Sequence, residues 1–524
     1  MAHITIYDTT LRDGSQTEGV SFTVSDKLKI TQKLDELGVP YVEGGWPGSN
    51  PKDKKYFKDV ASLKLKHAKI AAFGSTRRTK TSCAQDANLR ELVSAKTPTV
   101  TIFGKSWDLH VTDVIKTTLE ENLAMIFESV QFLKKKDKEV FYDAEHFFDG
   151  YKRNAEYALK SILAAQQAGA DCIVLCDTNG GTLPSDVNSI VTSVKRMVKT
   201  PLGIHTHNDL GMGVANSIAA VEAGCVQVQG TFNGLGERCG NADLVPIIGI
   251  LHTKLKLPSI PEKNVSKLME TSYFISEISN WRLPENAAFV GHSAFAHKGG
   301  VHIDAMIKNP LAYEHVDPKI VGNHRRFVTS ELAGKMPIII KAQEMDVTLD
   351  KKSPEAKRIM KALQEKENSG YQFEAADASF ELFMKRSLKK YKPFFKLESF
   401  KTSSEKRFDG HVFAEASIRV NVKGETCFAA AEGDGPVDAL NKALRQVLTK
   451  SYPRLAEMHL TDYKVRVLDT DEGTGARVRV LIESQDKADS WTTVGVHANI
   501  IEASWEALTD SIEYKLLKDE KDKG

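Results

Sequence analysis

The sequence lacks the features of secreted and membrane-spanning chains. It has only six cysteines in 524 residues, without the paired spacing of a zinc cage, and Cys172 and Cys176 fall in one apolar run where we expect buried, reduced thiols. No apolar run approaches the ~20 residues of a membrane-spanning helix. Residues 1–30 are interrupted by charged side chains, so they do not form a secretory signal. We expect a soluble, cytoplasmic protein.

An excess of charge of either sign is also missing. The chain has 71 Lys and Arg against 69 Asp and Glu, a formal net charge of +2, with the two signs mixed along its length. A protein that binds nucleic acid or a membrane surface would carry a concentrated basic patch. We therefore expect neither nucleic acid nor a membrane as a partner, and we interpret the charged run at 351–368 as an exposed linker helix.

What the sequence does contain is a repeated strand-and-helix pattern over residues 1–257. Short β-branched or aromatic runs recur along this region, and each is followed by a turn and an amphipathic helical stretch. Eight such units favour a closed (β/α)₈ barrel over an open, doubly wound sheet. The predicted strands are 3–8, 40–45, 68–74, 98–104, 139–145, 171–178, 201–207 and 226–234.

The pattern changes twice after the barrel. A mixed stretch, rich in His and aromatic residues, occupies residues 258–370, and strands alternating with helices over residues 371–524 predict a small α+β domain. In that domain Gly433 and Gly435 precede a predicted helix, where main-chain N–H groups could hold a carboxylate. A turn followed by a helix that begins with Pro is the alternative.

The segment "GIHTHNDLGMG" places two imidazoles on one predicted strand. Side chains two residues apart on a strand point to the same face, so His205 and His207 project together at the barrel mouth. Asp13, just past the first strand, supplies a carboxylate from a neighbouring strand end, because strands eight and one adjoin in a closed barrel. Asn241, after strand eight, could complete or support the set. These donors predict a divalent metal site.

Two histidines and one carboxylate leave coordination positions open. An open divalent metal can bind a bidentate oxygen ligand such as a 2-oxoacid and polarise its keto carbon. Arg12, next to Asp13, would add positive charge where an alkoxide or enolate develops.

Three motifs carry a family resemblance. "DTTLRDGSQTEG", "HTHNDLGMGVAN" and "GTFNGLGERCGNADL" resemble, in this order, the 2-isopropylmalate, homocitrate and citramalate synthases, which condense acetyl-CoA with a 2-oxoacid in a metal-bearing barrel. The resemblance extends over nearly the whole chain, since residues 258–370 look like the linker subdomains of that family and residues 371–524 like its regulatory domain.

The resemblance implies a role for each matching residue. The metal ligands would be Asp13, His205 and His207, with Asn241 in or near the coordination sphere. The metal would be Mn²⁺ or Mg²⁺, with Zn²⁺ as an alternative. Arg12 would polarise the oxo group, and Thr178 would bind the substrate carboxylate.

Three further positions match the catalytic machinery of the family. Glu145 matches an active-site glutamate, while His302 and Tyr313 match linker residues that reach the barrel of a neighbouring subunit, which implies a homodimer with exchanged linkers. A base must remove a methyl proton from acetyl-CoA, and both His302 and Glu145 remain candidates for it.

The identity of the 2-oxoacid depends on departures from 2-isopropylmalate synthases. This chain has "RDGSQTEG" where those enzymes resemble "RDGEQSPG", and "FYDAEHFFDGYK" is more similar to citramalate synthases. We therefore expect pyruvate as substrate, (R)-citramalate as product and feedback by isoleucine. The alternative is 2-oxoisovalerate, with leucine as effector. A small pocket, lined by Asp143 and Phe141 on the fifth strand and by Ile102 or Phe103 at the end of the fourth, would favour pyruvate. One methylene in an apolar pocket is nevertheless worth only ~1–3 kcal/mol.

Two other classes share parts of this pattern. Hydroxymethylglutaryl-CoA lyases carry a reactive Cys in a glycine-rich loop, but the text around Cys239 does not match that loop, and biotin-dependent carboxytransferases use a lysine where this chain has "CDTNGG". An amino-acid sensor on an inactive barrel is disfavoured because Arg12, Asp13, His205 and His207 are all intact.

Overall fold

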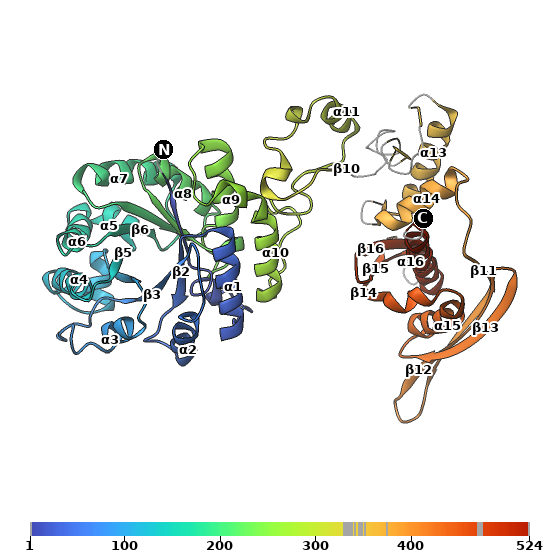
Figure 1. Cartoon of the computed structure of the whole chain (residues 1–524), viewed down its shortest axis with the longest axis horizontal. Helices are drawn as coiled ribbons and strands as arrows, with labels where there is room; N and C mark the ends of the chain where they lie inside the picture. The colour runs from blue at the N-terminus through green and yellow to red at the C-terminus, as the bar shows by residue number, and fades with distance from the viewer. Residues whose placement is uncertain are drawn as a thin grey trace. The chain divides into compact units, whose positions relative to one another are not determined.

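The structure, a computed structural model, describes residues 3–327, 339, 342–343, 349–350, 353–373, 376–468 and 475–521. The chain forms two compact units, one of residues 1–295 and 314–325, the other of residues 296–313 and 326–524. Figure 1 shows both, coloured along the chain. The three-part division at 257 and 370 stays a prediction.

The first unit is built on a closed barrel of eight parallel strands in sequential order, with β1 paired to both β2 and β8 (Figure 1). This confirms the predicted (β/α)₈ architecture. The largest shift from the predicted strand bounds is at β8, which ends at Gly230 because Asn233, at φ 61°, turns the chain into a short 3₁₀ helix. The strands are β1 Thr5–Asp8, β2 Tyr41–Gly45, β3 Lys69–Ser75, β4 Thr99–Lys105, β5 Glu139–Glu145, β6 Cys172–Asp177, β7 Leu202–Thr206 and β8 Gln227–Gly230.

Helices between the strands form the outer layer of the barrel. The first begins where Thr23 and Asp26 cap each other's backbone N–H groups, and it ends at Gly38, whose φ of 96° suits glycine. Its apolar stripe, including Ile30 and Leu34, packs into the shell between strands and helices. The helices are α1 Val24–Leu37, α2 Pro51–Val60, α3 Ala87–Ser94, α4 Leu119–Lys134, α5 Phe147–Arg153, α6 Ala155–Gln167, α7 Pro184–Met197, α8 Gly213–Glu222, α9 Leu244–Ile250 and α10 Leu268–Ser279.

A second, smaller cluster fills the inside of the barrel below its mouth. Tyr7 meets Phe141 edge-on, with 5.8 Å between ring centroids, and Val174 and the free thiols of Cys172 and Cys176 complete the layer. This confirms the expectation of buried, reduced thiols at both cysteines. The apolar plug leaves the polar side chains of the strands to gather at the carboxyl ends above it.

The second unit contains two three-stranded antiparallel sheets, each followed by a helix that packs on it. In the charged run at 351–368, the described residues Pro354–Asn368 form helix α13. This helix is not exposed on all sides, because Ile359 and Leu363 are buried in an apolar cluster. Gly435 directly precedes the predicted helix α15. No helix in the described ranges combines the length and apolar character needed to cross a bilayer. The elements are β9 Ala296–His297, α11 Gly300–Lys308, β10 Arg326–Phe327, α13 Pro354–Asn368, α14 Asp377–Ser387, β11 Phe395–Lys406, β12 Val412–Val422, β13 Glu425–Gly433, α15 Pro436–Ser451, β14 His459–Val467, β15 Val478–Gln485, β16 Ser490–His497 and α16 Ile500–Lys521.

A buried carboxyl on α16 makes the stability of the second unit depend on pH. Burial raises the pKa of Glu513 to about 7, against the opposing hydrogen bond from the main-chain N–H of Phe394. The pKa of Glu513 is higher in the folded than in the unfolded chain. Its contribution to the unfolding free energy is therefore complete below about pH 4.5 and is lost as the pH rises through about 7. In Glu513→Gln we expect this loss, on the order of 3 kcal/mol of unfolding free energy, to disappear.

Unfolding of the second unit followed calorimetrically at pH 5 and pH 8 measures this effect. The difference in unfolding free energy between the two pH values should be smaller in Glu513→Gln than in the unsubstituted chain. An equal difference in both proteins would show that Glu513 does not carry the pH dependence.

Candidate active site

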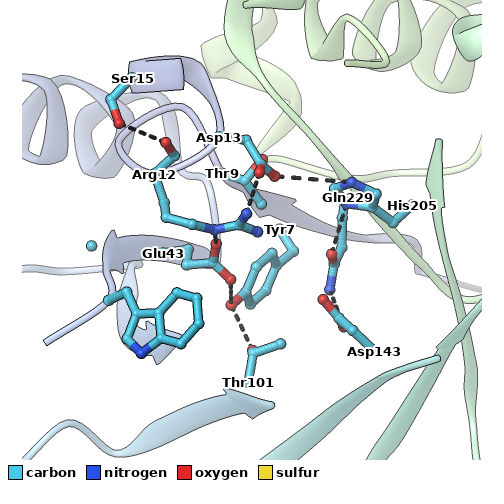
Figure 2. A network of polar contacts seen from close by, with 12 residues as sticks. Tyr7, Thr9, Arg12, Asp13, Ser15, Glu43, Thr101, Asp143, His205 and Gln229 are labelled. Carbon is cyan, nitrogen blue, oxygen red and sulfur yellow. Dashed lines mark hydrogen bonds and ion pairs between the residues drawn. The ribbon is translucent and has the colours of Figure 1, made fainter. Parts of the chain in front are cut away.

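The carboxyl ends of β1, β7 and β8 bring four predicted metal ligands to the barrel mouth. His205 lies near the end of β7 and His207 just after it, with 3.4 Å between their Nε2 atoms. Asp13 follows β1, and its Oδ2 lies 3.9 Å from His205 Nε2 (Figure 2). Asn241 pairs its main chain with that of His207 in an isolated β-bridge. The predicted set is therefore gathered in one place.

Each of three residues in this set buries a polar atom that has no hydrogen-bond partner among the described residues. These atoms are Asp13 Oδ2, His207 Nδ1 and Asn241 Oδ1. A buried polar atom without a partner is destabilising, and such atoms are rare in folded proteins. Carboxylate, imidazole and amide donors together suit a divalent metal.

The side chains do not, as they lie, enclose a metal centre. Within the described ranges no group of three or more His, Cys, Asp and Glu side chains meets that geometry. The guanidinium of Arg12 donates to Asp13 Oδ1, so one of the two carboxylate oxygens is already engaged (Figure 2). The metal site therefore stays a prediction, supported by the donor set.

The electrostatics keep these donors in the forms that bind metals. Burial lowers the pKa of His205, and burial together with His205 lowers the pKa of His207 to about 3. Burial alone would raise the pKa of Asp13, but Arg12 and the two imidazoles lower it below its usual value. At neutral pH the site thus contains two neutral imidazoles and an ionised carboxylate.

Arg12 is fixed from three sides. Its Nε donates to Glu43 Oε1 at 2.5 Å, its Nη1 donates to Asp13, and its guanidinium lies 3.7 Å from the ring centroid of Phe73. Glu43 also accepts a hydrogen bond from the Tyr7 hydroxyl at 2.6 Å (Figure 2). A guanidinium held by two carboxylates and a ring face is oriented before any substrate arrives.

Behind His205, two side chains from the barrel interior form a relay of hydrogen bonds. Gln229 Oε1 lies 3.0 Å from His205 Nδ1, and Gln229 Nε2 donates to Asp143 Oδ1 at 3.1 Å (Figure 2). Because the amide NH₂ is engaged by Asp143, the amide oxygen accepts from Nδ1–H, which leaves the lone pair of Nε2 free to face the mouth. Burial, together with the charge of Glu43, raises the pKa of Asp143 well above its ordinary value.

We expect Gln229→Leu to weaken divalent metal binding about 10- to 100-fold, because the tautomer of His205 is then no longer fixed. Isothermal titration with Mn²⁺ measures this. Gln227→Leu is the matched control, since Gln227 is a buried glutamine on the same strand and face but contacts Cys172. Equal affinity in the Gln229 and Gln227 variants would contradict the assignment.

Three aromatic side chains form a wall beside Arg12. Trp46 meets Phe73 and Phe103 edge-on, with ring centroids 5.8 and 5.6 Å apart, while Phe73 and Phe103 stack at 5.5 Å. Phe103 thus belongs to this wall, whereas Ile102 is buried in the apolar shell between strands and helices. The role of Phe103 and Asp143 as pocket residues stays a prediction, since Asp143 is engaged by Gln229.

Glu145 and Thr178 lie at the ends of neighbouring strands β5 and β6. Glu145 forms an ion pair with Lys105 at the end of β4. The Thr178 hydroxyl accepts a hydrogen bond from the main-chain N–H of His146 at 2.9 Å, and Arg238 Nη2 donates to the Thr178 carbonyl oxygen at 2.9 Å. Both predicted residues therefore belong to the rim of the same barrel.

His302 and Tyr313 belong to the second unit, where they contact one another. His302 lies on α11, and its ring lies 4.2 Å from that of Tyr313, which is 46% exposed. Val301 and Leu311 are exposed as well, at 78% and 81%. The predicted action of this segment in a neighbouring subunit's barrel stays a prediction.

Sequence reasoning missed Glu43 and Gln229, which hold Arg12 and His205 in place. Both are fully buried: Glu43 lies in β2 beside Val42, and Gln229 lies in β8, which also contains the buried Gln227. A charged or amide side chain within a buried strand was the available signal, because such groups are buried only when they have a partner. The partner itself, 31 residues away for Glu43 and 24 for Gln229, depends on strand order.

Family models match the chain in three consecutive segments. A model described as HMGL-like matches residues 3–275, one described as the homocitrate synthase post-HMGL domain matches residues 289–369, and one described as the LeuA allosteric (dimerisation) domain matches residues 374–516. The barrel with its polar mouth is thus of the HMGL-like class.

Curated relatives match over the full length. An (R)-citramalate synthase of Geobacter sulfurreducens is 53% identical over 100% of this chain and 99% of its own, and one of Aquifex aeolicus is 52% identical over 99% and 98%. A 2-isopropylmalate synthase of Methanocaldococcus jannaschii is 31% identical over 98% and 95%. The chain belongs to the family of 2-isopropylmalate, homocitrate and citramalate synthases, and it is more similar to these two citramalate synthases than to that 2-isopropylmalate synthase.

Proposed function

We propose that this chain is an (R)-citramalate synthase, which condenses acetyl-CoA with pyruvate and water to (R)-citramalate and CoA. The observation that carries the proposal is the set of unpaired donors on Asp13, His207 and Asn241 beside a fixed Arg12. This set lies at the mouth of a barrel in a chain 53% identical to a curated (R)-citramalate synthase. The reaction would feed isoleucine biosynthesis in the cytoplasm.

Asp13, His205 and His207, with Asn241 in or beside the sphere, would hold a divalent ion that polarises the keto group of the 2-oxoacid. Mn²⁺ or Mg²⁺ fits this proposal, with Zn²⁺ as the alternative. Arg12 places its positive charge where the keto oxygen becomes an alkoxide. The hydroxyl of Thr178 already accepts a hydrogen bond from the main-chain N–H of His146, and it donates a hydrogen bond to the substrate carboxylate.

The condensation requires a base for the methyl group of acetyl-CoA. Removal of this proton gives an enolate, whose carbon attacks the keto carbon and forms the new bond. Water then hydrolyses the thioester, and CoA leaves as the thiol. Two side chains are candidates for this base: Glu145, which is ion-paired with Lys105 in the barrel, and His302 from a partner's linker, whose ring lies 4.2 Å from that of Tyr313.

The wall of Trp46, Phe73 and Phe103 supports a small pocket beside Arg12. A methyl group fits against such a wall more readily than an isopropyl group, which favours pyruvate over 2-oxoisovalerate. Because the difference in an apolar pocket is worth ~1–3 kcal/mol, we expect measurable but slower turnover of the larger substrate.

We infer further that the chain works as a homodimer with exchanged linkers and that isoleucine inhibits it through the LeuA domain. The exposed side chains of Val301, Leu311 and Tyr313 support the first inference, and the match at residues 374–516 supports the second.

Free-thiol release from acetyl-CoA tests the proposal directly. The metal-loaded protein is offered pyruvate and 2-oxoisovalerate in parallel, with and without a chelator. We expect faster release with pyruvate, and its loss on chelation. Faster release with 2-oxoisovalerate would replace citramalate synthesis by 2-isopropylmalate synthesis, and release unaffected by chelation would overturn the metal site.

A further inference from the structure

The backbone turns sharply where β5 ends. Glu145 is the last residue of the strand, and the next residue, His146, has φ 55° and ψ 33°, in the left-handed region. Residues other than glycine are uncommon there, and they persist only when the surrounding structure holds them in place. Helix α5 begins directly afterwards at Phe147, so the turn is confined to one residue.

At this turn the main-chain N–H of His146 donates to the hydroxyl of Thr178 at 2.9 Å, and Thr178 directly follows β6, the next strand of the barrel. A threonine hydroxyl can accept hydrogen bonds and donate one. Since it accepts from His146 and has no acceptor of its own among the described residues, its proton is available to a ligand in the mouth. The carbonyl of Thr178 is held separately by Arg238, at 2.9 Å.

The imidazole of His146 is anchored on two sides. Its Nδ1 lies 3.3 Å from Asp149 Oδ2, which also accepts from Asn179 at 3.0 Å. Its ring lies 4.2 Å from that of His110, which follows β4. The side chain is buried, with 8% of the residue exposed. These contacts hold the ring against α5 and against the segment that follows β4, and they help to maintain the left-handed backbone.

We infer that His146 is a positioning residue, whose left-handed main chain orients the Thr178 hydroxyl to donate to the carboxylate of the substrate. The inference rests on the proposed function, because it assigns the 2-oxoacid carboxylate to Thr178. His146 acts on the substrate only through Thr178, and its imidazole serves to hold the backbone.

The test compares substitutions of His146 that all remove the imidazole but differ in how well they tolerate the left-handed backbone. His146→Gly and His146→Asn remove the imidazole but tolerate the left-handed region, whereas His146→Val removes it and disfavours that region. We expect the KM for the 2-oxoacid to rise about tenfold in His146→Val and to change much less in the Gly and Asn variants. The KM for acetyl-CoA should stay within about twofold in all three.

A double-mutant cycle with Thr178→Val tests whether the effect passes through Thr178. In the Thr178→Val background, His146→Val should give no further rise in the KM for the 2-oxoacid. Equal losses in the Gly, Asn and Val variants, or additive effects in the cycle, would overturn the inference. Where the Val variant does not fold, as thermal unfolding shows, His146→Ala against His146→Asn provides the same comparison.

The outcomes separate this inference from the proposed function. If Thr178→Val alone leaves the KM for the 2-oxoacid unchanged while the unsubstituted chain condenses acetyl-CoA with pyruvate, the inference fails and the function stands. If the unsubstituted, metal-loaded chain releases no thiol with either 2-oxoacid, the proposed function fails, and the inference fails with it.

Discussion

Replacing either imidazole at the end of β7 should abolish turnover without unfolding the barrel. In His205→Ala and His207→Ala, we expect kcat to fall about 1,000-fold or more and Mn²⁺ affinity to fall with it. Each change removes one of two neutral donors that face one another at 3.4 Å. The barrel should stay folded, because neither ring belongs to its apolar clusters.

Steady-state thiol release and metal titration measure both effects, and circular dichroism checks the fold. His67→Ala is the control, since His67 lies on the outside of the same unit with an exposed side chain. Turnover within tenfold of the unsubstituted chain in either imidazole variant would remove His205 and His207 from the metal site.

The second large effect is expected at Arg12. In Arg12→Lys the positive charge remains, but the fork that joins Asp13 to Glu43 is lost, as is the planar stack on Phe73. We expect kcat to fall about 100- to 1,000-fold, because the charge is no longer fixed where the alkoxide develops. The KM for acetyl-CoA should change little, since Arg12 is assigned to the 2-oxoacid.

Arg77→Lys is a matched control for this substitution. Arg77 is also a buried arginine bound to two carboxylates, those of Glu121 and Glu128, but it lies outside the site. A similar fall in kcat in both variants would show that the loss at Arg12 reflects general destabilisation. Unchanged kcat in Arg12→Lys would show that any nearby positive charge suffices.

The sequence predicts the barrel because its signals are local. Each strand is a short β-branched or aromatic run bounded by a turn. The hydrophobic periodicity and the turn residues can be recognised without knowing which other strands lie beside it. The clustering of Asp13, His205, His207 and Asn241 follows once closure places β7, β8 and β1 side by side. The predicted strand runs past the end of β8, because Thr231 and Phe232 continue the β-branched and aromatic pattern up to the turn signal of Asn233 and Gly234.

The supporting contacts could not be predicted in the same way. Glu43 contacts Arg12, and Gln229 lies between His205 and Asp143. Both contacts depend on which side chains of different strands lie at the same level along the barrel axis. The level follows from strand stagger, which composition and periodicity do not specify. The left-handed turn at His146 is only partly local, since its ring contacts Asp149 on α5 but also His110, which follows β4.

The pairing of β1 with β8 has a consequence for how the protein folds. This junction of the first and last strands is the seam of the barrel. There Thr9 donates a hydrogen bond to Gly230, 221 residues further along the chain, and Asp13, after β1, lies near His205 on β7. Contacts between such distant residues form late, because a large loop must close before they are made. The seam cannot form on the ribosome until β8 has emerged, so the nascent chain gains its candidate metal site at the end of barrel synthesis. Until then, the edge of β1 that does not face β2 has no partner strand and is open to pairing with other chains.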